Sequence, residues 1–455
     1  MSLTGLFHRR VLLPTFETGI KRRPVMRLWR ELERSQWLGW ERIQGMQFEA
    51  LGALIRHAFE SCPYYRDSWT RLGLGPEALK TLEDLGRWPV IERETVREHR
   101  MRMRSMRPMR LLTKATGGSS GAPLTFDLDE GSNDRRMAAW HRGYGWAGAA
   151  PGTKQLHLWG VSTGERTWKK RLKDELYHRM YRRRIVSCFG MGEGFAGSFV
   201  RALERERPDA IVAYTNPLYE VACRLEEAGE RPGWRPRAVV VGAEKLHDFQ
   251  RERIERVFGA RVFETYGSRE FMLIGGECER HQGLHITAEH LIVEVADDRG
   301  RPVPSGVEGN VVITDLYNYG MPFIRYANGD RAVAAAGRCE CGRGLPMLAR
   351  VSGRVLEMIR TPDGRVLAGE FFPHLMKDFG AVRRFQVIQE EPARVRVLLV
   401  APALREDDRR RLESCIGEAL GPEVHVEFES VAEIPLTGSG KHQVVVNRAA
   451  LRRAA

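Results

Sequence analysis

The sequence predicts an α/β protein with a large N-terminal domain and a small α+β C-terminal domain. The chain has 455 residues, and single hydrophobic cores stop growing at roughly 250–300 residues. From about residue 110, short apolar runs alternate with amphipathic helical stretches, a pattern typical of βαβ units and parallel sheets. After Glu289 the pattern changes to alternating strands separated by turns, which predicts a β-rich subdomain.

Each part of this fold has its own sequence signature. Residues 1–110 are polar and helical in pattern, with tryptophans as apolar anchors. The expected parallel strands are 155–159, 210–214, 238–241 and 261–264, with helices at 194–205 and 217–229. The β-rich subdomain is expected at 287–350, with strands 291–295 and 310–314. We expect the large domain at 1–352 and a small mobile domain at 353–455, with strands 385–389, 395–400 and 424–428 and a helix at 406–420.

The formal net charge of +13 and the seven cysteines restrict the class of protein. Basic residues cluster at 21–23, 101–110 and 169–184, which is compatible with a nucleic-acid surface or with solvated helix faces. We expect solvated faces. An odd number of unevenly spaced cysteines argues against a disulfide scaffold. Because no apolar run approaches the ~20 residues of a membrane span, we expect a cytoplasmic protein.

The first candidate site is a stretch rich in glycine and hydroxyl residues. Glycine lets backbone N–H groups turn toward one point and hydroxyls add donors, so this stretch suits the oxygens of a triphosphate. It is not a Walker loop, because G-x-x-x-x-G-K-[ST] is absent. A flexible Gly/Ser loop is the alternative. The residues of this stretch are Thr116, Gly117, Gly118, Ser119, Ser120 and Gly121.

The second candidate site directly follows the expected strand at 261–264. It consists of Tyr266, Gly267, Ser268, Arg269 and Glu270. Open α/β sheets bind ligands in loops at the carboxyl ends of their strands. The ring of Tyr266 is suited to stack on adenine, and the carboxylate of Glu270 is suited to hold Mg²⁺ against phosphates. A plain strand-to-loop turn is the alternative.

Three further segments carry polar residues suited to a nucleotide. Asp330 ends the segment PFIRYANGD, where a carboxylate could accept both hydroxyls of a ribose. Arg354 follows Ser352 and Gly353 at the expected domain boundary. Lys441 ends the loop PLTGSGK, from which a mobile ammonium could reach a phosphate. Taken singly, these residues are equally compatible with solvated turns.

These five segments, in this order and spacing, resemble the adenylate-forming superfamily of acyl-CoA synthetases. The chain is most similar to the phenylacetate–CoA ligase family, in the branch encoded in capsular-polysaccharide gene clusters. Further matches are PYYR at 63–66, LEDLGRWPVIERETVREH at 82–99, and Gly242, Ala243 and Glu244 after a strand. The resemblance implies an enzyme that uses ATP and Mg²⁺ to activate a carboxylic acid as an acyl-adenylate. Pyrophosphate would be released and the acyl group would pass to CoA.

The resemblance also implies roles for individual residues. The stretch 116–121 would cradle the β- and γ-phosphates, and 242–244 would line the adenine pocket with Tyr266 against the base. Glu270 would hold Mg²⁺ and Asp330 would bind the ribose. Lys441 would contact the α-phosphate and the attacking carboxylate oxygen, which makes Lys441 and Glu270 the expected catalytic residues. Gly267, Ser268 and Arg354 complete the expected nucleotide site.

Three residues depart from the pattern of many relatives. Ala122 stands where many carry lysine, and Arg269 where many carry threonine, although arginine is usual in this branch. Leu356 stands at a hinge where relatives place an acidic residue or lysine. In the superfamily the small domain rotates about this hinge between adenylation and thioester formation. The acceptor is therefore left open between CoA and a carrier protein, a sugar or a cofactor hydroxyl.

A set of cysteine and histidine residues predicts a metal site. Cys278 and His281 form C-x-x-H, and Cys339 and Cys341 form C-x-C, which together are the ligand types of a Cys₃His zinc site. Four protein ligands leave no open coordination position, so such a zinc would be structural. Some members of the resembled family carry a structural zinc at this place. His285 is a substitute ligand or an active-site residue, and reduced thiols without a metal are the alternative.

Two alternatives belong to other classes. A basic zinc-containing nucleic-acid-binding protein accounts for the charge and the cysteines, but it gives Glu270 and Lys441 no role. A non-catalytic scaffold relative gives them no role either. The acid pocket is expected around Trp140, Tyr144, Trp146 and Trp159, whose rings suit an aryl acid or an ordinary core. The identity of the acid and the formation of a homodimer stay open.

Overall fold

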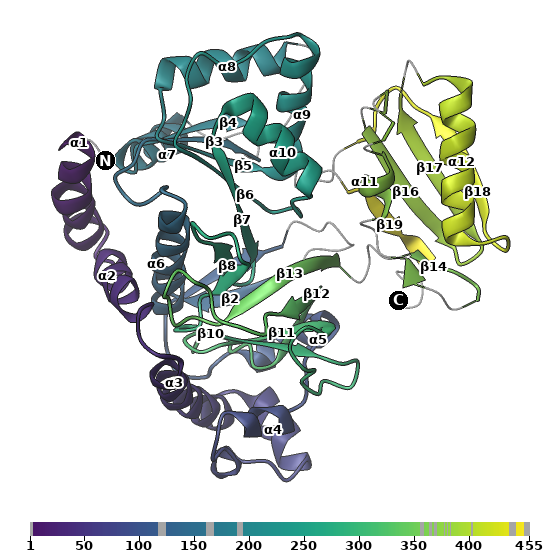
Figure 1. The fold of residues 1–455 in the computed structure, drawn as a ribbon. Helices are drawn as coiled ribbons and strands as arrows, with labels where there is room; N and C mark the ends of the chain where they lie inside the picture. Colours follow the sequence, from purple (N-terminus) through teal and green to yellow (C-terminus); the bar gives the residue numbers. More distant parts are fainter. Residues whose placement is uncertain are drawn as a thin grey trace. The chain divides into compact units, whose positions relative to one another are not determined.

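The computed structural model describes residues 3–116, 124–160, 168–188, 194–354, 359–363, 366–367, 371–376, 378–379, 381–382, 384–401, 404–435 and 443–449. The chain divides into two compact units (Figure 1). The large unit comprises Met1–Thr116, Leu124–Asn328 and Ala332–Val351. The small unit comprises Ser352–Ala455 together with Gly117–Pro123 and Gly329–Arg331.

The main sheet has 11 strands in the order β10-β11-β12-β13-β9-β8-β7-β6-β5-β3-β4. Its parallel half consists of β3 (Gln155–Trp159), β4 (Arg183–Ser187), β5 (Ala210–Tyr214), β6 (Ala238–Gly242) and β7 (Arg261–Ser268). Every residue of β5 and β6 is buried, as expected for strands covered on both faces. The predicted α/β fold with parallel strands is confirmed.

The two faces of the parallel strands pack against different helices. Ile211 and Val239 point toward α8 (Phe195–Glu206), α9 (Thr215–Glu227) and α10 (Asp248–Phe258). Their neighbours Val212 and Val240 pack on the opposite face, against the C-terminal end of α6 (Glu130–Trp146). Alternation of side chains along a strand thus supplies one apolar surface to each layer.

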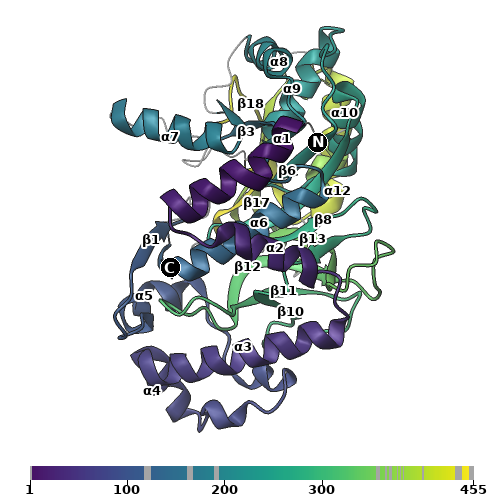
Figure 2. The same ribbon diagram turned by 90° about the vertical axis from the view of Figure 1, so that its left-hand side faces the viewer.

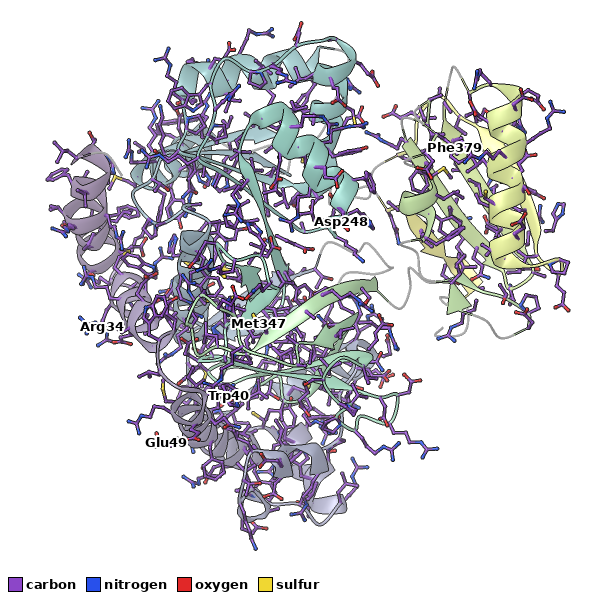
Figure 3. The ribbon with its side chains drawn as sticks, in the orientation of Figure 1. Arg34, Trp40, Glu49, Asp248, Met347 and Phe379 are labelled. Carbon is purple, nitrogen blue, oxygen red and sulfur yellow. The ribbon has the colours of Figure 1, made fainter. Side chains whose placement is uncertain are left out.

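The antiparallel half of the sheet begins where β7 pairs with β8. Its strands are β8 (Met272–Glu277), β9 (Leu284–Ile286), β10 (Leu291–Ala296), β11 (Glu308–Asp315), β12 (Tyr326–Ala334) and β13 (Met347–Arg354). One hydrophobic cluster fills the space between these strands and the helices of the first hundred residues. Trp40, which begins α3, and Met347, which begins β13, both belong to this packing (Figure 3).

Helices dominate the first hundred residues, as predicted. They are α1 (Leu3–Phe7), the π-helices η1 (His8–Leu12) and η2 (Thr15–Ile20), α2 (Val25–Ser35), α3 (Trp40–Ser61), α4 (Pro63–Arg71), the 3₁₀ turns η3 (Pro76–Ala78) and η4 (Glu83–Arg87), and α5 (Arg93–Met103). A hairpin of β1 (Leu111–Ala115) and β2 (Thr125–Asp129) follows. Asp129 Oδ1 accepts the N–H of Ser132 at 2.8 Å and so caps α6, along which α2 packs (Figure 2). Helix α7 spans Trp168–Met180.

The small unit is an α+β fold, as predicted. Its four-stranded sheet has the order β18-β17-β16-β19. The strands are β16 (Arg384–Glu391), β17 (Arg394–Val400), β18 (His425–Ser430) and β19 (Val445–Asn447), with β14 (Ile359–Arg360) and β15 (Val366–Leu367) forming a separate pair. The helices are α11 (Phe371–Met376) and α12 (Glu406–Leu420). Leu412, Ile416 and Leu420 lie one turn apart on α12 and are buried in the core of this unit.

Among the helices of the described ranges, none is long and apolar enough to cross a lipid bilayer.

Candidate functional site

Three consecutive strands of the parallel half end at one edge of the sheet, and the segments after β6 and β7 are predicted to bind a nucleotide. β5 is followed by Thr215 and Asn216 at the start of α9, and β6 runs into Gly242, Ala243 and Glu244. β7 ends in Tyr266–Ser268 and continues into Arg269 and Glu270. Parallel strands carry their carboxyl ends on the same edge, so the fold brings these segments together.

The turn after β7 requires glycine at position 267. A Cβ atom there would lie 1.9 Å from the carbonyl oxygen of Met272, because β7 folds back closely onto β8. Ser268 Oγ accepts the backbone N–H of Phe271 at 3.3 Å, and Met272 adopts a φ of +66°. The close approach of the two strands is by itself a sufficient reason for glycine at this position, whether or not a ligand binds. The turn places Arg269 and Glu270 at its tip.

Glu270 is held from two sides. Its carboxylate Oε1 accepts the hydroxyl of Tyr326 at 3.3 Å, and its backbone carbonyl accepts the guanidinium of Arg136. Arg136 also pairs with Asp315, and both side chains are 1% exposed. The part of the chain that the structure describes gives the Glu270 carboxylate no ion pair, although the residue is buried. A buried carboxylate without a protein cation beside it is suited to hold a divalent cation.

Tyr266 lies in the core with its polar end fixed. The residue is 9% exposed, and its hydroxyl accepts the side-chain amide N–H of Asn328 at 2.7 Å. Gly242 approaches β7 closely, since a Cβ atom there would lie 2.4 Å from Thr265 Oγ1. Ala243 has a φ of +69°, in the left-handed region that non-glycine residues seldom adopt. Such strained positions cluster at ligand sites.

Glu244 connects two of the converging segments. Its Oε2 accepts the backbone N–H of Asn216 at 2.8 Å, and its backbone carbonyl accepts the Thr215 hydroxyl at 3.1 Å. The carboxylate therefore contacts the first turn of α9, where the helix dipole favours a negative charge. This contact is structural and leaves the predicted adenine contact of Glu244 a prediction.

Thr116 closes the glycine-rich stretch at its base. Its backbone N–H donates to the carbonyl of Leu124 at 2.9 Å, and its hydroxyl accepts the N–H of Leu124 at 2.9 Å. The same hydroxyl oxygen accepts Arg93 Nη2 at 2.8 Å. Ala122, Leu356 and Lys441 lie outside the described residues. So do the other predicted residues of the stretch, which are Gly117, Gly118, Ser119, Ser120 and Gly121.

Asp330 and Arg354 are residues of the strands β12 and β13. Asp330 is a carboxylate of β12 and is 7% exposed, and Arg354 is the last residue of β13. Their predicted nucleotide contacts remain predictions.

The four aromatic residues predicted around the acid do not form one wall. The ring of Trp140 lies 4.8 Å from that of Tyr144, and Trp159 lies 4.3 Å from Tyr214. Trp140, Tyr144 and Trp159 border the core between α6 and the parallel strands, whereas Tyr214 belongs to the core on the opposite face. Trp146 instead donates its indole N–H to Gln36 Oε1 at 2.7 Å and packs against His285, in the other core.

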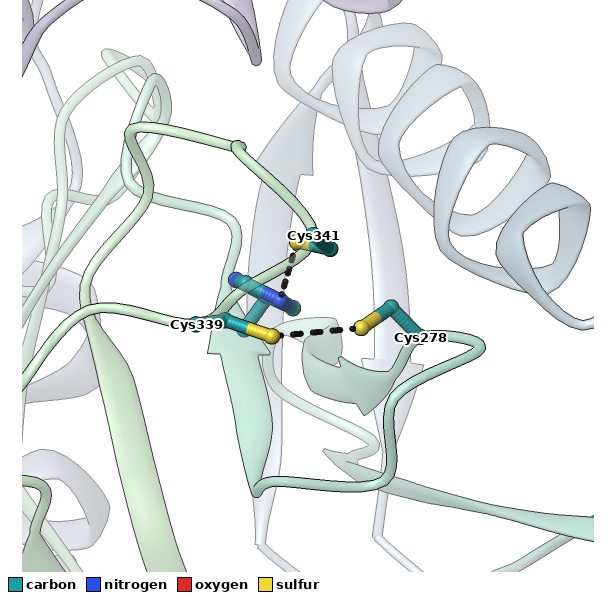
Figure 4. Close-up of side chains that lie close together, drawn as sticks. Cys278, Cys339 and Cys341 are labelled. Carbon is teal, nitrogen blue, oxygen red and sulfur yellow. Dashed lines mark hydrogen bonds between the residues drawn. The ribbon is translucent and has the colours of Figure 1, made fainter.

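Three thiols and one imidazole form a compact cluster. The ligand atoms of Cys278, His285, Cys339 and Cys341 all lie within 4.8 Å of one another. The sulfurs of Cys278 and Cys339 are 3.6 Å apart, and Cys341 Sγ lies 3.3 Å from His285 Nε2 (Figure 4). Tetrahedral zinc with sulfur ligands at ~2.3 Å requires sulfurs about 3.8 Å apart. The side chains fit a Cys₃His zinc site.

The fourth member of this cluster is His285, and the prediction of His281 is wrong. His281 has a φ of +52° in the turn between β8 and β9, which rotates its ring away from the sulfurs. Its Nδ1 lies 3.2 Å from Glu277 Oε2, and Phe263 packs against the ring at 4.6 Å. His285 lies on β9 opposite Met347 of β13, which places its ring beside Cys341.

Local contacts prepare the cluster for a cation. The backbone N–H of Arg280 donates to Cys278 Sγ at 3.4 Å, and that of Arg343 donates to Cys341 Sγ at 3.5 Å. Burial, assisted by Arg343, lowers the pKa of His285 to about 4, which keeps the imidazole neutral and able to bind a metal. Burial also raises the pKa of Cys278 to about 12, so that thiol needs a cation to ionise at neutral pH.

Sequence reasoning did not single out Arg136, Tyr326 or Asn328. Each forms a hydrogen bond with a predicted residue that is distant in the sequence. Arg136 and Tyr326 bond to Glu270, and Asn328 bonds to Tyr266. Nothing in the local sequence marks these contacts, although Tyr326 and Asn328 lie inside the segment that predicted Asp330.

Comparison with known proteins finds a family model that matches the C-terminal part and relatives that match most of the chain. Residues 359–448 match the family model of the CapK C-terminal domain. A phenylacetate-coenzyme A ligase of Thermus thermophilus is 26% identical over 400 residues, which cover 83% of this chain and 86% of the ligase. Protein CapK of Staphylococcus aureus is 21% identical over 422 residues, covering 89% of this chain and 88% of CapK.

The fold is shared with a solved acid–CoA ligase. The crystal structure of 2-hydroxyisobutyryl-CoA ligase in the postadenylation state, in complex with R3-HIB-AMP, matches with a TM-score of 0.73. The match covers 93% of each chain at 20% sequence identity.

Proposed function

We propose that this chain, which is similar to phenylacetate–CoA ligases and to CapK, belongs to the adenylate-forming phenylacetate–CoA ligase family and is an AMP-forming carboxylate–CoA ligase. It converts a carboxylic acid and ATP into an acyl-adenylate and pyrophosphate, and then transfers the acyl group to CoA. The observation that carries this proposal is the convergence of the segments after β5, β6 and β7 at one sheet edge beside the buried carboxylate of Glu270.

Glu270 serves as the magnesium ligand in this proposal. When bound, Mg²⁺ would offset the negative charge of the phosphates that the carboxylate of the acid has to approach. The Tyr326 hydroxyl and the Arg136 guanidinium fix the carboxylate and backbone of Glu270, so little reorganisation accompanies the reaction. The remaining nucleotide contacts follow the family pattern: 116–121 for the phosphates, 242–244 and Tyr266 for adenine, Asp330 for ribose, with Gly267, Ser268 and Arg354 nearby.

Lys441 delivers a positive charge to the reacting groups in the same proposal. The attack of a carboxylate on the α-phosphate joins two anions, so a positioned ammonium stabilises the transition state more than the separated reactants. Release of pyrophosphate leaves the acyl group bonded to AMP, and attack of the acceptor thiol on the acyl carbon then releases AMP.

The acceptor has one alternative that a specific observation favours. The C-terminal part matches the CapK family model, and the similarity to CapK spans most of the chain. Transfer of the acyl group to a non-CoA acceptor in polysaccharide or cofactor biosynthesis is therefore the second candidate function. Measuring acyl transfer from the adenylate to CoA and to sugar acceptors distinguishes the two.

Ion pairs in the structure argue against one of the basic clusters as a nucleic-acid surface. In the basic run at 101–110, Arg104 pairs with Asp127, Arg102 with Asp67 and Arg107 with Glu60. These arginines are partly neutralised by carboxylates of the same unit, so they do not form a free cationic surface.

We also propose that the cluster of Cys278, His285, Cys339 and Cys341 holds a structural zinc. The metal would tie the β8–β9 turn to the segment that links β12 with β13.

An exchange assay tests the proposed function. The full-length protein is incubated with ATP, Mg²⁺, labelled pyrophosphate and each acid of a panel of aryl and aliphatic carboxylic acids. We expect acid-dependent incorporation of label into ATP, which Glu270→Gln suppresses and the exposed control Glu49→Gln on α3 does not (Figure 3). Label incorporation that is independent of every acid, or equal in Glu270→Gln, contradicts the proposal.

A further inference from the structure

Helix α7 exposes three large apolar side chains on one of its sides. Trp168, Leu172 and Leu176 follow one another at intervals of four residues, which places them along one side of an α-helix. They are 69%, 50% and 53% exposed and are called the α7 stripe below. The other side of the helix packs on the protein, since the ring of Tyr177 lies 6.2 Å from that of Phe16 on η2. The helix lies beside β4, the last strand of the main sheet (Figure 2).

The charge around the α7 stripe is strongly positive. Residues 168–184 contain eight lysines and arginines but two acidic residues, so this short segment carries a large share of the net charge of +13. Lys169 and Lys173 are both exposed, and at 3.6 residues per turn they lie directly beside the stripe. The exposed carboxylate of Glu175 pairs with Arg179 at 2.8 Å. The exposed side of α7 therefore combines an apolar centre with a cationic flank.

This combination fits the surface of an anionic lipid membrane better than other partners. Helices that lie in a membrane surface place Trp and Leu at the acyl boundary and lysines among the phosphates. A second copy of the chain docked on the same face would bring Lys169 and Lys173 of both copies together, and like charges repel. The phosphates of a nucleic acid would pair with the lysines but would leave the two leucines in water.

The length of α7 fixes how it can meet a bilayer. The helix has 13 residues and is thus about 20 Å long, which is shorter than the ~30 Å hydrocarbon core of a bilayer. Its buried side is also occupied by contacts with η2, such as that between Tyr177 and Phe16. The helix can therefore lie on a membrane surface but cannot cross the membrane.

We propose that α7 binds the surface of an anionic phospholipid membrane. The α7 stripe enters the acyl boundary, and Lys169 and Lys173 contact the lipid phosphates. Membrane binding is a property beyond the ligase reaction, and it would hold the enzyme at the surface of the bilayer.

Co-sedimentation of the full-length protein with vesicles tests this proposal. One set of vesicles is pure phosphatidylcholine, and the other contains phosphatidylglycerol as well. The stripe variant combines Trp168→Gln, Leu172→Gln and Leu176→Gln, and the charge variant combines Lys169→Gln with Lys173→Gln. The matched control replaces three apolar residues of similar exposure elsewhere in the large unit, at 56%, 66% and 60%, by glutamine: Leu72, Met101 and Met106.

We expect the wild type and the control to bind the phosphatidylglycerol vesicles equally and the pure phosphatidylcholine vesicles far more weakly. The stripe variant should lose at least about 100-fold in affinity, because burial of one large apolar side chain contributes about tenfold or more. The charge variant should lose about fivefold for each lysine, and added salt should reduce this difference. Thermal unfolding followed by circular dichroism checks that every variant is folded.

The proposal is overturned if the wild type does not bind phosphatidylglycerol vesicles, if the stripe variant binds them as the wild type does, or if the control loses as much affinity. A dimer that the stripe variant dissociates, seen by light scattering without vesicle binding, would make the stripe a contact between copies instead. Binding to random-sequence DNA without vesicle binding would assign the segment to nucleic acid. Because vesicle binding is measured without ATP or acid, its failure leaves the proposed ligase reaction unaffected.

Discussion

The buried pair of Arg142 and Glu289 joins the helices to the strands around the candidate site, and its removal gives a prediction that can be worked from the structure. Arg142 Nη1 and Nη2 donate to the two carboxylate oxygens of Glu289 at 2.5 and 3.0 Å, and Ser35 Oγ donates to Oε1 at 2.7 Å. The side chains of Arg142 and Glu289 are 0% and 4% exposed. Because Arg142 lies on α6, this pair fixes the helix whose Arg136 holds Glu270.

Breaking such a pair from one side leaves the other charge buried. Removal of one partner from a buried pair lowers the free energy of unfolding by about 3–5 kcal/mol. We expect Arg142→Met to lower it by about 3 kcal/mol, because Ser35 still donates a hydrogen bond to the remaining carboxylate. Glu289→Met should lower the free energy of unfolding by about 4–5 kcal/mol, since the described residues leave the guanidinium only a 3.4 Å hydrogen bond to the carbonyl of Leu32 and the ring of Trp146 at 5.0 Å. In the double variant no charge is left buried, so its cost should fall to about 1 kcal/mol.

Urea unfolding followed by tryptophan fluorescence measures these free energies in the large unit, because all ten tryptophans of the chain belong to it. The matched control is Arg27→Met, which breaks an exposed 3.7 Å pair with Glu31 on α2. Exposed pairs contribute about 0–1 kcal/mol, so the control should barely change stability. Single variants that cost under about 1 kcal/mol, or a double variant that costs the sum of the two, would refute the reasoning.

The remaining predictions concern the site and the metal cluster. Glu270→Gln should lower the rate of ATP–pyrophosphate exchange by about 10²–10³-fold, and an unchanged rate would remove Glu270 from the reaction. Lys441→Ala should abolish most of the exchange while calorimetry still detects ATP binding; wild-type exchange would disprove its role. His285→Ala should lose zinc to a chelator while His281→Ala retains it, as measured by metal analysis, and the reverse order would contradict the cluster.

Apolar runs predicted the buried parallel strands because a strand covered on both faces needs apolar side chains at every position. The runs at 210–214 and 238–241 correspond to β5 and β6, in which every residue is buried. β4 was missed, because this edge strand (Arg183–Ser187) carries arginines and has no fully buried residue. Strand prediction from hydrophobicity therefore works best at the centre of the sheet.

The candidate site was predictable where the chemistry is local, and unpredictable where it depends on a turn or on a distant partner. Glu270 and Tyr266 were found because they follow an apolar strand directly. His281 was chosen over His285 because it completes a C-x-x-H spacing, whereas the left-handed backbone at His281 turns its ring away. Arg136 reaches Glu270 across 134 positions of the chain, a separation that no local pattern reveals.

The most direct test of acid activation follows an oxygen atom. When a carboxylate attacks the α-phosphate of ATP, one of its oxygens remains on AMP after the acyl group is transferred. The protein is supplied with ATP, Mg²⁺, an acceptor and a substrate acid labelled with ¹⁸O in both carboxylate positions, and the products are analysed by mass spectrometry. We predict one ¹⁸O atom in each AMP released and none in pyrophosphate. AMP without the label, or label in inorganic phosphate, would contradict acyl-adenylate formation.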